Sequence, residues 1–178
     1  MTSATESIVL GGGCFWCLDA SYRLINGVLS VESGYAGGHV KDPTYDQVCA
    51  GTTGHAEVVR VTFNPEIITL GEILDIFWAL HDPTTLNRKG NDVGEQYRSI
   101  IFYATPEQRK TAEMSVRAAA ALWEDPIVTD IQALDTFYLA EEEHQDFFAN
   151  HPESAYCQVI INPKLTKLRK KFADRIKQ

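Results

Sequence analysis

Cys14 and Cys17 are the residues whose type and spacing most directly indicate chemistry. Cys14 follows three glycines, Gly11 to Gly13, which end a short apolar segment and are typical of a tight turn. The residues after it predict a helix, and the backbone N–H groups and dipole at a helix start favour negative charge. We therefore expect Cys14 to be a nucleophilic thiolate with a lowered pKa, left uncovered by the glycines before it.

The Cys14-x-x-Cys17 spacing has three other interpretations. Two thiols three residues apart on a helix lie within disulfide range and can form a redox-active dithiol pair. The spacing is also half of a zinc site, but no second Cys-x-x-Cys pattern accompanies it, and Cys49 and Cys157 are scattered. We therefore expect neither a metal ion nor another cofactor. The third interpretation, a buried structural thiol, leaves the glycines and the second cysteine without a purpose.

Two irregular stretches, residues 36–55 and 81–98, contain polar groups that can serve this cysteine. Loops of this length in a compact domain are usually functional. The first contains Tyr45 and ends just before Glu57, which can act as a general acid if burial raises its pKa. The second contains Tyr97, and tyrosine hydroxyl groups in such loops can hold an oxygen atom.

The elements that must position these residues follow from the apolar pattern. From residue 7 to 103 the predicted order is strand, helix, strand, strand, helix, strand, which is the split βαβ order of a two-layer α+β domain. We expect strands at 7–10, 28–35, 57–63, 100–103 and 128–134, and helices at 15–25, 69–80, 105–122, 139–150 and from 162 onward.

Length and composition predict one globular domain, residues 1–178. The chain has 44% hydrophobic and 22% charged residues, which excludes a disordered or fibrous protein. No apolar run is long enough to span a membrane, and the N-terminus does not resemble a signal peptide. We therefore expect a cytoplasmic protein, in which clustered thiols stay reduced and are catalytic, redox-active or metal-binding.

The charge is distributed unevenly. Of 24 acidic and 16 basic residues, one acid and seven bases lie from Lys164 onward, which leaves 23 acids and 9 bases, a net charge of −14, in residues 1–163. This acidic body argues against nucleic-acid binding. A basic amphipathic helix can bind a membrane or calmodulin, but we expect the helix in residues 162–178 to pack on the acidic body instead.

Short motifs, in this order along residues 8 to about 157, make the chain resemble the A-type peptide methionine sulfoxide reductases. Each motif is weak alone, and together they are highly specific. The motifs are Gly-Gly-Cys14-Phe15-Trp16, Gly34-Tyr-Ala-Gly-Gly38, Pro43-Thr-Tyr45, Thr53-Gly-His-Ala-Glu57, His81-Asp-Pro83, Gly90-Asn-Asp92, Gln96-Tyr97-Arg-Ser99 and Ala140-Glu…His144-Gln.

The resemblance implies roles for the thiols and their aromatic neighbours. Cys14 matches the family nucleophile, and Phe15 and Trp16 match the pocket that takes the methyl group of the substrate. Cys157 matches a resolving cysteine near the C-terminus, on a segment able to swing towards Cys14. The chain departs from the family at Cys17, where glycine is common, so Cys17 is a second candidate for the resolving thiol.

The resemblance also implies which groups act on the sulfoxide oxygen. Tyr45, Glu57 and Tyr97 match the groups that hold this oxygen, and Glu57 matches its proton donor. Asp92 matches a loop carboxylate that shapes the same site. The fold implied is an α/β roll around the split βαβ, ferredoxin-like core.

The activity implied is reduction of the S epimer of methionine sulfoxide, in proteins and as the free amino acid. It repairs oxidised proteins through a cysteine sulfenic acid and an intramolecular disulfide that thioredoxin reduces. The alternative is a thiol–disulfide exchange protein that uses Cys14 and Cys17. Two other features have ordinary explanations: Cys49 as a small, partly buried residue, and Glu141 to Glu143 as a solvated helix face.

Overall fold

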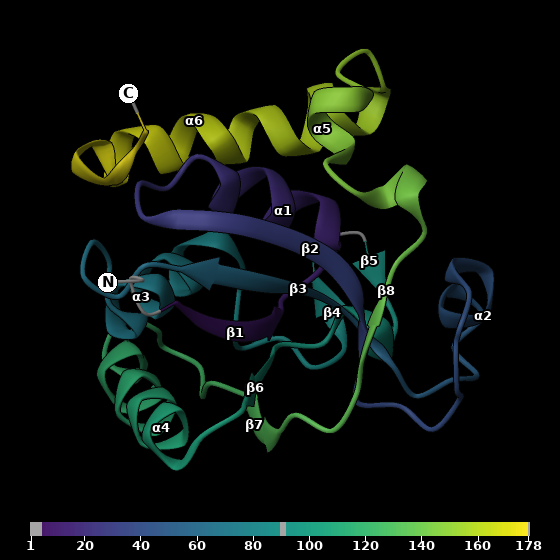
Figure 1. Ribbon diagram of the computed structural model, residues 1–178, viewed down its shortest axis with the longest axis horizontal. Helices are drawn as coiled ribbons and strands as arrows, with labels where there is room; N and C mark the ends of the chain where they lie inside the picture. Colours follow the sequence, from purple (N-terminus) through teal and green to yellow (C-terminus); the bar gives the residue numbers. More distant parts are fainter. Residues whose placement is uncertain (1–4, 90–91, 178) are drawn as a thin grey trace.

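A six-stranded sheet forms the centre of a mixed α/β fold (Figure 1). The structure is a computed structural model that describes residues 5–89 and 92–177. The strand order is β7-β6-β1-β3-β2-β8, with antiparallel neighbours except for the parallel pair β6 and β7. The strands are β1 (Glu6–Gly11), β2 (Val28–Ala36), β3 (Ala56–Phe63), β6 (Ile100–Tyr103), β7 (Asp130–Ala133) and β8 (Phe137–Leu139).

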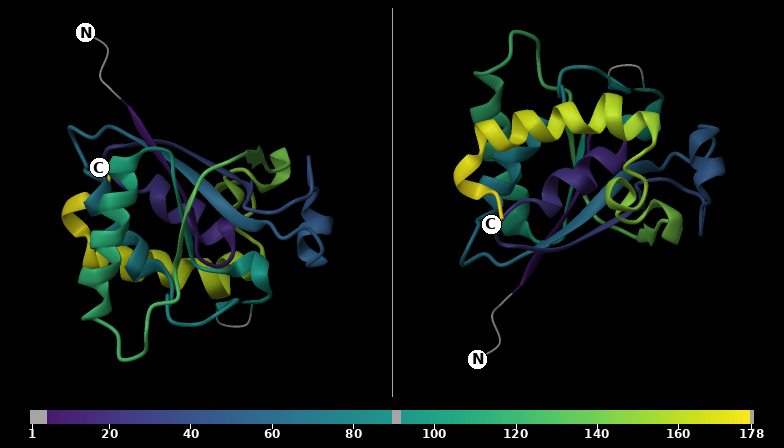
Figure 2. Two further views of the ribbon diagram at one scale, coloured as in Figure 1. Left: turned by 90° about the horizontal axis from the view of Figure 1, so that it is seen from below. Right: turned by 90° about the horizontal axis from the view of Figure 1, so that it is seen from above.

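Helices pack on one face of this sheet. Figures 1 and 2 show that α6 lies across α1. The short helix α2 projects from the end of the molecule that lies away from α3 and α4. Capping residues begin several of the helices, as the sequence predicts: Thr69 and Thr105 each accept a hydrogen bond from a backbone N–H in the first turn. The helices are α1 (Phe15–Arg23), α2 (Tyr45–Cys49), α3 (Leu70–Leu80), α4 (Pro106–Ala120), α5 (Phe147–Asn150) and α6 (Asn162–Lys171).

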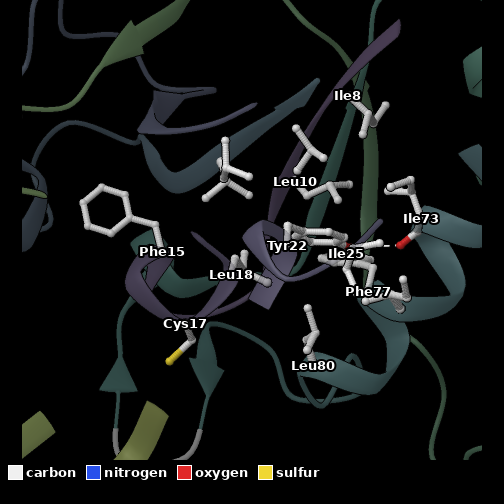
Figure 3. Close-up of a cluster of buried hydrophobic side chains, with 14 of the residues drawn as sticks. Ile8, Leu10, Phe15, Cys17, Leu18, Tyr22, Ile25, Ile73, Phe77 and Leu80 are labelled. Atoms are coloured by element: carbon white, nitrogen blue, oxygen red, sulfur yellow. Dashed lines mark hydrogen bonds between the residues drawn. The ribbon is translucent and has the colours of Figure 1, made fainter. Parts of the chain in front are cut away.

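Alternation along β1 divides the buried side chains between the two faces of the sheet. Ile8 and Leu10 join the large core beneath α1 and α3, whereas Val9 joins a smaller cluster on the other face. Figure 3 shows this large core, in which the Tyr22 hydroxyl group donates a hydrogen bond of 2.9 Å to the Ile73 carbonyl oxygen. This bond ties α1, the helix that follows Cys14, to α3.

The helix predicted for residues 139–150 is wrong. Residue 139 ends β8, a 3₁₀ turn covers Glu142–His144, and α5 has only four residues. Asp146, in the left-handed region at φ 49°, donates its backbone N–H to the buried carboxylate of Asp19 at 2.8 Å. These tertiary bonds outweigh the helix propensity of the segment.

The two predicted loops contain short elements that the apolar pattern does not indicate. Residues 36–55 include α2, which Thr44 begins with a capping box. Residues 81–98 include a two-stranded pair, β4 (Arg88–Lys89) and β5 (Asp92–Val93), and a 3₁₀ turn at Glu95–Tyr97.

The C-terminal residues continue the helical layer. A π-helical segment, Cys157–Ile161, runs directly into α6, which buries Leu165 and Leu168 against α1 and α3. The helix expected over 162–178 ends at Lys171, and a 3₁₀ turn follows at Ala173–Arg175. Within the described ranges, every helix is too short or too polar to cross a lipid bilayer.

Candidate active site

The turn between β1 and α1 places Cys14 immediately before the helix. Gly13 has φ +97°, a conformation that favours glycine, and its N–H donates to the Tyr97 carbonyl oxygen at 3.2 Å. A Cβ atom at Gly12 would lie 3.0 Å from the His81 ring, so a side chain here would require this ring to shift. Cys14 is the N-cap residue of α1, as predicted, and 8% of it is exposed.

The thiol of Cys14 differs from the expected thiolate. Burial raises the pKa of Cys14 well above its usual value, and the charges of Glu57 and Cys17 add to this effect. Hydrogen bonds from the Trp16 backbone and the Tyr156 side chain act in the opposite direction but are outweighed. The prediction of a lowered pKa from the helix start is therefore wrong, because the sequence pattern does not report how deeply the sulfur is buried.

Glu57 lies next to this thiol on the neighbouring strand. It occupies the second position of β3, pairs with Tyr35 of β2 and is 1% exposed. Its Oε1 atom accepts the backbone N–H of Phe15 at 3.3 Å, which fixes the carboxyl group against the first turn of α1. The fold thus brings together the two groups that the sequence places 43 positions apart.

Aromatic side chains form a wall beside the start of α1. Phe15 is fully buried and Trp16 half-buried, with ring centroids 6.4 Å apart. Trp16 stacks on Phe147 at 3.8 Å, and Tyr45 lies 6.2 Å from Phe15 and 6.3 Å from Trp16. Phe15, Trp16 and Tyr45 are therefore close in space, as expected, and Phe147 is an addition that the sequence did not indicate.

Glu141 holds Tyr45 in this wall. Its two carboxylate oxygens accept the Tyr35 hydroxyl group and the Tyr45 backbone N–H, each at 3.0 Å. Burial alone would raise the pKa of Glu141, but these hydrogen bonds outweigh it and lower the pKa. The prediction of a solvated helix face at Glu141 is wrong, because the segment is not a helix and its first carboxylate points inward.

Tyr45 itself is poised as a neutral hydrogen-bond donor. Burial raises its pKa, and a hydrogen bond with Cys49 and the charge of Glu57 raise it further. Cys49 is exposed, one helical turn after Tyr45 in α2. The interpretation of Cys49 as a partly buried packing residue is therefore wrong.

His144 joins the site through its imidazole ring. Its Nδ1 atom accepts a hydrogen bond of 3.2 Å from the Trp16 indole N–H, and its ring lies 4.2 Å from that of Tyr45. The motif Ala140-Glu…His144-Gln contains this residue, but its partner, Trp16, lies 128 positions earlier in the chain, so spacing alone does not reveal the contact.

One cluster in the described residues has the spacing of a metal site. Its side-chain atoms, which lie within 4.8 Å of one another, come from Glu141, Glu143 and His144. The donor set does not suit a metal ion. Because Nδ1 of His144 accepts from Trp16, the neutral ring carries its proton on Nε2, the atom 3.9 Å from Glu143. Both oxygens of Glu141 already accept hydrogen bonds.

Three of the four cysteines lie in the large core. Cys17 is 4% and Cys157 0% exposed, and the described residues form no disulfide. The Tyr156 hydroxyl group lies 3.8 Å from the Cys17 sulfur and is also hydrogen-bonded to Cys14. Cys157 begins the π-helical segment, and its N–H donates to Ser154 Oγ at 3.1 Å. It therefore lies in a helical segment, whereas we expected a segment free to swing towards Cys14.

Tyr97 and Asp92 lie in the second loop. The Tyr97 carbonyl oxygen contacts Gly13, which places this residue beside the turn that carries Cys14. Asp92 belongs to β5, but its side chain lies outside the described parts of the structure, as does the neighbouring Asn91.

The comparisons with known proteins agree with one another. The family model of peptide methionine sulfoxide reductase matches residues 6–176. The peptide methionine sulfoxide reductase MsrA of Pseudarthrobacter chlorophenolicus is 60% identical over 168 residues, which are 94% of this chain and 97% of the relative. The crystal structure of Mxr1 from Saccharomyces cerevisiae in reduced form has a TM-score of 0.83 and 36% identity, over 88% of this chain and 91% of that one. Mxr1 in complex with Trx2 has a TM-score of 0.59 and 28% identity, over 83% and 87% of the two chains.

Proposed function

The chain belongs to the peptide methionine sulfoxide reductase family, and we propose that it reduces the S epimer of methionine sulfoxide, in proteins and as the free amino acid, with Cys14 as the nucleophile. The observation that carries the assignment of Cys14 is its position at the start of α1, beside the buried Glu57 and the wall of Phe15 and Trp16. The site thus combines a thiol, an acid and an apolar surface.

The first step transfers oxygen from the substrate to the enzyme. The sulfur of Cys14 attacks the sulfoxide sulfur, the S–O bond of the substrate breaks, and the products are methionine and a sulfenic acid on Cys14. One thiol and one sulfoxide give one sulfenic acid and one thioether, so cysteine is oxidised by two electrons and methionine sulfoxide is reduced by two.

Glu57 supplies the proton that makes the substrate sulfur electrophilic. Burial of a carboxyl group favours its protonated form, and a protonated acid can donate to the sulfoxide oxygen as the thiol attacks. The raised pKa of Cys14 fits this arrangement, because it keeps the buried thiol protonated until substrate arrives. Tyr45 and Tyr97 hold the same oxygen by hydrogen bonds, and Asp92 shapes the loop beside them.

The aromatic wall selects the methyl group. A methyl group packed between Phe15 and Trp16 gains ~1–3 kcal/mol from apolar contact. The hydrogen bond to His144 and the stacking on Phe147 hold Trp16 in a single orientation.

The second step regenerates the thiol. The sulfenic acid condenses with a second thiol to give a disulfide and water, and a dithiol reductant then reduces that disulfide. We assign Cys157 as the first resolving thiol and Cys17 as the second partner or relay; Tyr156, adjacent to Cys157, touches both Cys14 and Cys17. The complex of yeast Mxr1 with Trx2 supports thioredoxin as the reductant.

We also infer that residues 1–178 form one reductase domain, in the cytoplasm, around a split βαβ core. The order β6-β1-β3-β2, with antiparallel neighbours, supports this core. In it, α1 connects β1 to β2 across β3, and α3 connects β3 to β6 across β1.

The test is single-turnover reduction of methionine sulfoxide without added reductant. Cys14→Ser is expected to form no methionine, whereas Cys17→Ser is expected to form one equivalent. Mass spectrometry of the wild-type protein after the reaction should show an oxidised Cys14. Product from Cys14→Ser would overturn the assignment, and loss of the single turnover in Cys17→Ser would favour the alternative of thiol–disulfide exchange through Cys14 and Cys17.

A further inference from the structure

A cavity of about 930 Å³ extends from Cys14 to the C-terminal helix. Its walls are the end of α3, Trp123 and one face of the helix formed by residues 157–171. This volume lies near the upper end of the range for ligand sites, ~300–1,000 Å³, and exceeds what one methionine sulfoxide side chain requires. Phe15, Trp16 and Tyr45 do not line it, so the cavity continues on another side of Cys14 from the aromatic wall.

One stripe of the C-terminal helix lines this cavity, which we call the groove. Tyr156 lies at the Cys14 end, and Ile160, Lys164, Lys167 and Lys171 follow at intervals of three or four residues. Residues with this spacing share one face of a helix. The stripe therefore leads away from the reactive sulfur, first over an apolar stretch and then along three lysines.

No acidic partner balances the three lysines among the described residues, although the Nζ atom of Lys171 lies over the Phe172 ring, 5.8 Å from its centroid. In the described parts of the chain, none of them forms an ion pair, whereas Arg23, Arg60, Arg109 and Arg175 all do. Asp82 is the single carboxylate among the described residues that line the groove, and its Oδ1 accepts the Thr84 backbone N–H at 2.9 Å. The groove thus carries three positive charges against one negative charge.

This positive groove contrasts with the rest of the protein. Residues 1–163 have a net charge of −14, so an acidic ligand is repelled by the body as a whole and attracted only where the lysines gather. The floor between the lysines and Cys14 is apolar: Trp78 is 5% and Leu168 3% exposed. An apolar floor with a cationic edge suits an extended peptide that carries acidic side chains.

We propose that this groove binds the segment of an oxidised protein that flanks the methionine sulfoxide, and that it selects segments with acidic residues. The inference rests on the proposed function, because the bound segment must be continuous with the side chain that Cys14 attacks. The groove ends at Cys14, whose sulfur the substrate must reach, and its cationic edge complements an acidic substrate segment.

Helix geometry sets the distance of the acidic residues from the sulfoxide. Lys164 and Lys171 follow Tyr156 by eight and fifteen residues, or at most roughly 12 and 22 Å along the helix axis, because the π-helical segment Cys157–Ile161 rises less per residue than an α-helix. An extended peptide covers these distances in about four to seven residues. Acidic residues four to seven positions from methionine sulfoxide, on one side of it, are therefore expected to contact the lysines.

The experiment compares two double variants with the same change in charge. Lys167→Glu with Lys171→Glu reverses two exposed lysines of the groove, and Arg169→Glu with Lys170→Glu reverses two exposed bases of α6 that do not line it. The substrates are methionine sulfoxide peptides with glutamate or glutamine at positions four to seven, on either side. Dithiothreitol is the reductant, so that docking of thioredoxin does not enter the measurement.

The expected result is a loss of selectivity in the groove variant alone. The ratio of kcat/KM for the glutamate peptide to that for the glutamine peptide should fall ~10-fold in Lys167→Glu/Lys171→Glu and stay within twofold of wild type in Arg169→Glu/Lys170→Glu. Equal ratios in the two variants would overturn the proposal. A normal ratio with dithiothreitol, combined with slow turnover on thioredoxin, would overturn it in favour of a reductant site.

A binding measurement separates this proposal from the proposed function. Fluorescence anisotropy of labelled peptides that contain unoxidised methionine reports binding without chemistry. Weaker binding of the glutamate peptide to the groove variant supports the groove even if no reduction occurs. Normal reduction by the wild-type protein, with equal binding of glutamate and glutamine peptides, refutes the groove and leaves the function intact.

Discussion

The indole N–H of Trp16 donates a hydrogen bond to Nδ1 of His144 across 3.2 Å, and this bond ties the first turn of α1 to the 3₁₀ turn at Glu142–His144. The bond requires a neutral imidazole ring, because a protonated ring has no acceptor. Burial lowers the pKa of His144, and the charges of Glu141 and Glu143 oppose this only in part. The fold therefore favours the form of His144 that holds Trp16.

The first prediction concerns pH and stability. The unfolded chain binds a proton on His144 as the pH falls through about 6.5, whereas the folded protein binds it only at a lower pH. The contribution of His144 is therefore complete above pH 6.5 and is lost as the pH falls from 6.5 to the lowered pKa. Urea unfolding between pH 5 and 8 should show a smaller loss of stability in His144→Asn than in wild type.

His39→Asn is the matched control for this measurement. His39 is exposed, so its removal should leave the pH dependence of the free energy of unfolding unchanged. An identical slope for wild type and His144→Asn would show that the buried ring does not contribute to the acid sensitivity of the fold.

The second prediction concerns the methyl pocket. Trp16→Ala removes a half-buried ring that contacts Phe147 and lies beside Phe15. Apolar contact with one methyl group is worth ~1–3 kcal/mol, so KM for methionine sulfoxide should rise ~10-fold or more. If KM is unchanged and only the thermal stability falls, the ring serves packing rather than substrate binding.

The third prediction concerns the proton donor. Glu57→Gln keeps the size of the side chain but removes its acidic proton, so the single-turnover rate should fall ~10²–10⁴-fold, the usual range for general acid catalysis. Tyr45→Phe and Tyr97→Phe should each cost less, because either hydroxyl group partly replaces the other. A Glu57→Gln variant with wild-type rates across pH would remove this residue from the mechanism.

The fourth prediction follows from the charge that Glu57 places near Cys14. Burial raises the pKa of Cys14 most, and Glu57 raises it further, so Glu57→Gln should lower the pKa. Alkylation of Cys14 by iodoacetamide, followed by peptide mapping, should therefore be faster at pH 8 in this variant while the reduction of substrate is slower. Glu66→Gln, which changes an exposed carboxylate, should alter neither rate.

The sequence was sufficient for the elements that carry Cys14 and Glu57. Apolar alternation and capping signals located β1, β3, α3 and α4 within a few residues, because these elements bury regular apolar faces. The same reasoning failed for residues 139–150, whose structure depends on Asp19, Tyr35 and Tyr45, three residues far away in the chain.

In the candidate site, too, the sequence predicts what depends on local pattern and misses what depends on distant residues. The glycines and the helix start located Cys14 correctly but gave the wrong direction for its pKa, because burial outweighs the effect of the helix start. Glu141 lies in an irregular segment and Tyr156 directly before the π-helical segment, and no local pattern marks them as contacts of Tyr45 and Cys14. Such contacts arise from tertiary structure and have no local signal in the sequence.

The last prediction concerns the thiol that resolves the sulfenic acid on Cys14. Cys17 is nearest in sequence, and its N–H donates to the Cys14 carbonyl oxygen at 3.2 Å, within the first turn of α1. Cys157 is fully buried, and its backbone N–H is held by Ser154 Oγ at 3.1 Å. We nevertheless expect a disulfide between Cys14 and Cys157. Tyr156, the residue directly before Cys157, already contacts the Cys14 sulfur.

Peptide mapping of the enzyme after one turnover, without reductant, identifies the disulfide directly. Cys157→Ser should keep its single turnover and lose most of its thioredoxin-dependent turnover, and Cys49→Ser, which changes an exposed thiol, is the matched control that should keep both. If Cys157→Ser turns over fully with thioredoxin and the map shows a bridge between Cys14 and Cys17, the first turn of α1 contains the whole redox pair. In that case Tyr156, which contacts both sulfurs, would have to move aside as the bridge forms.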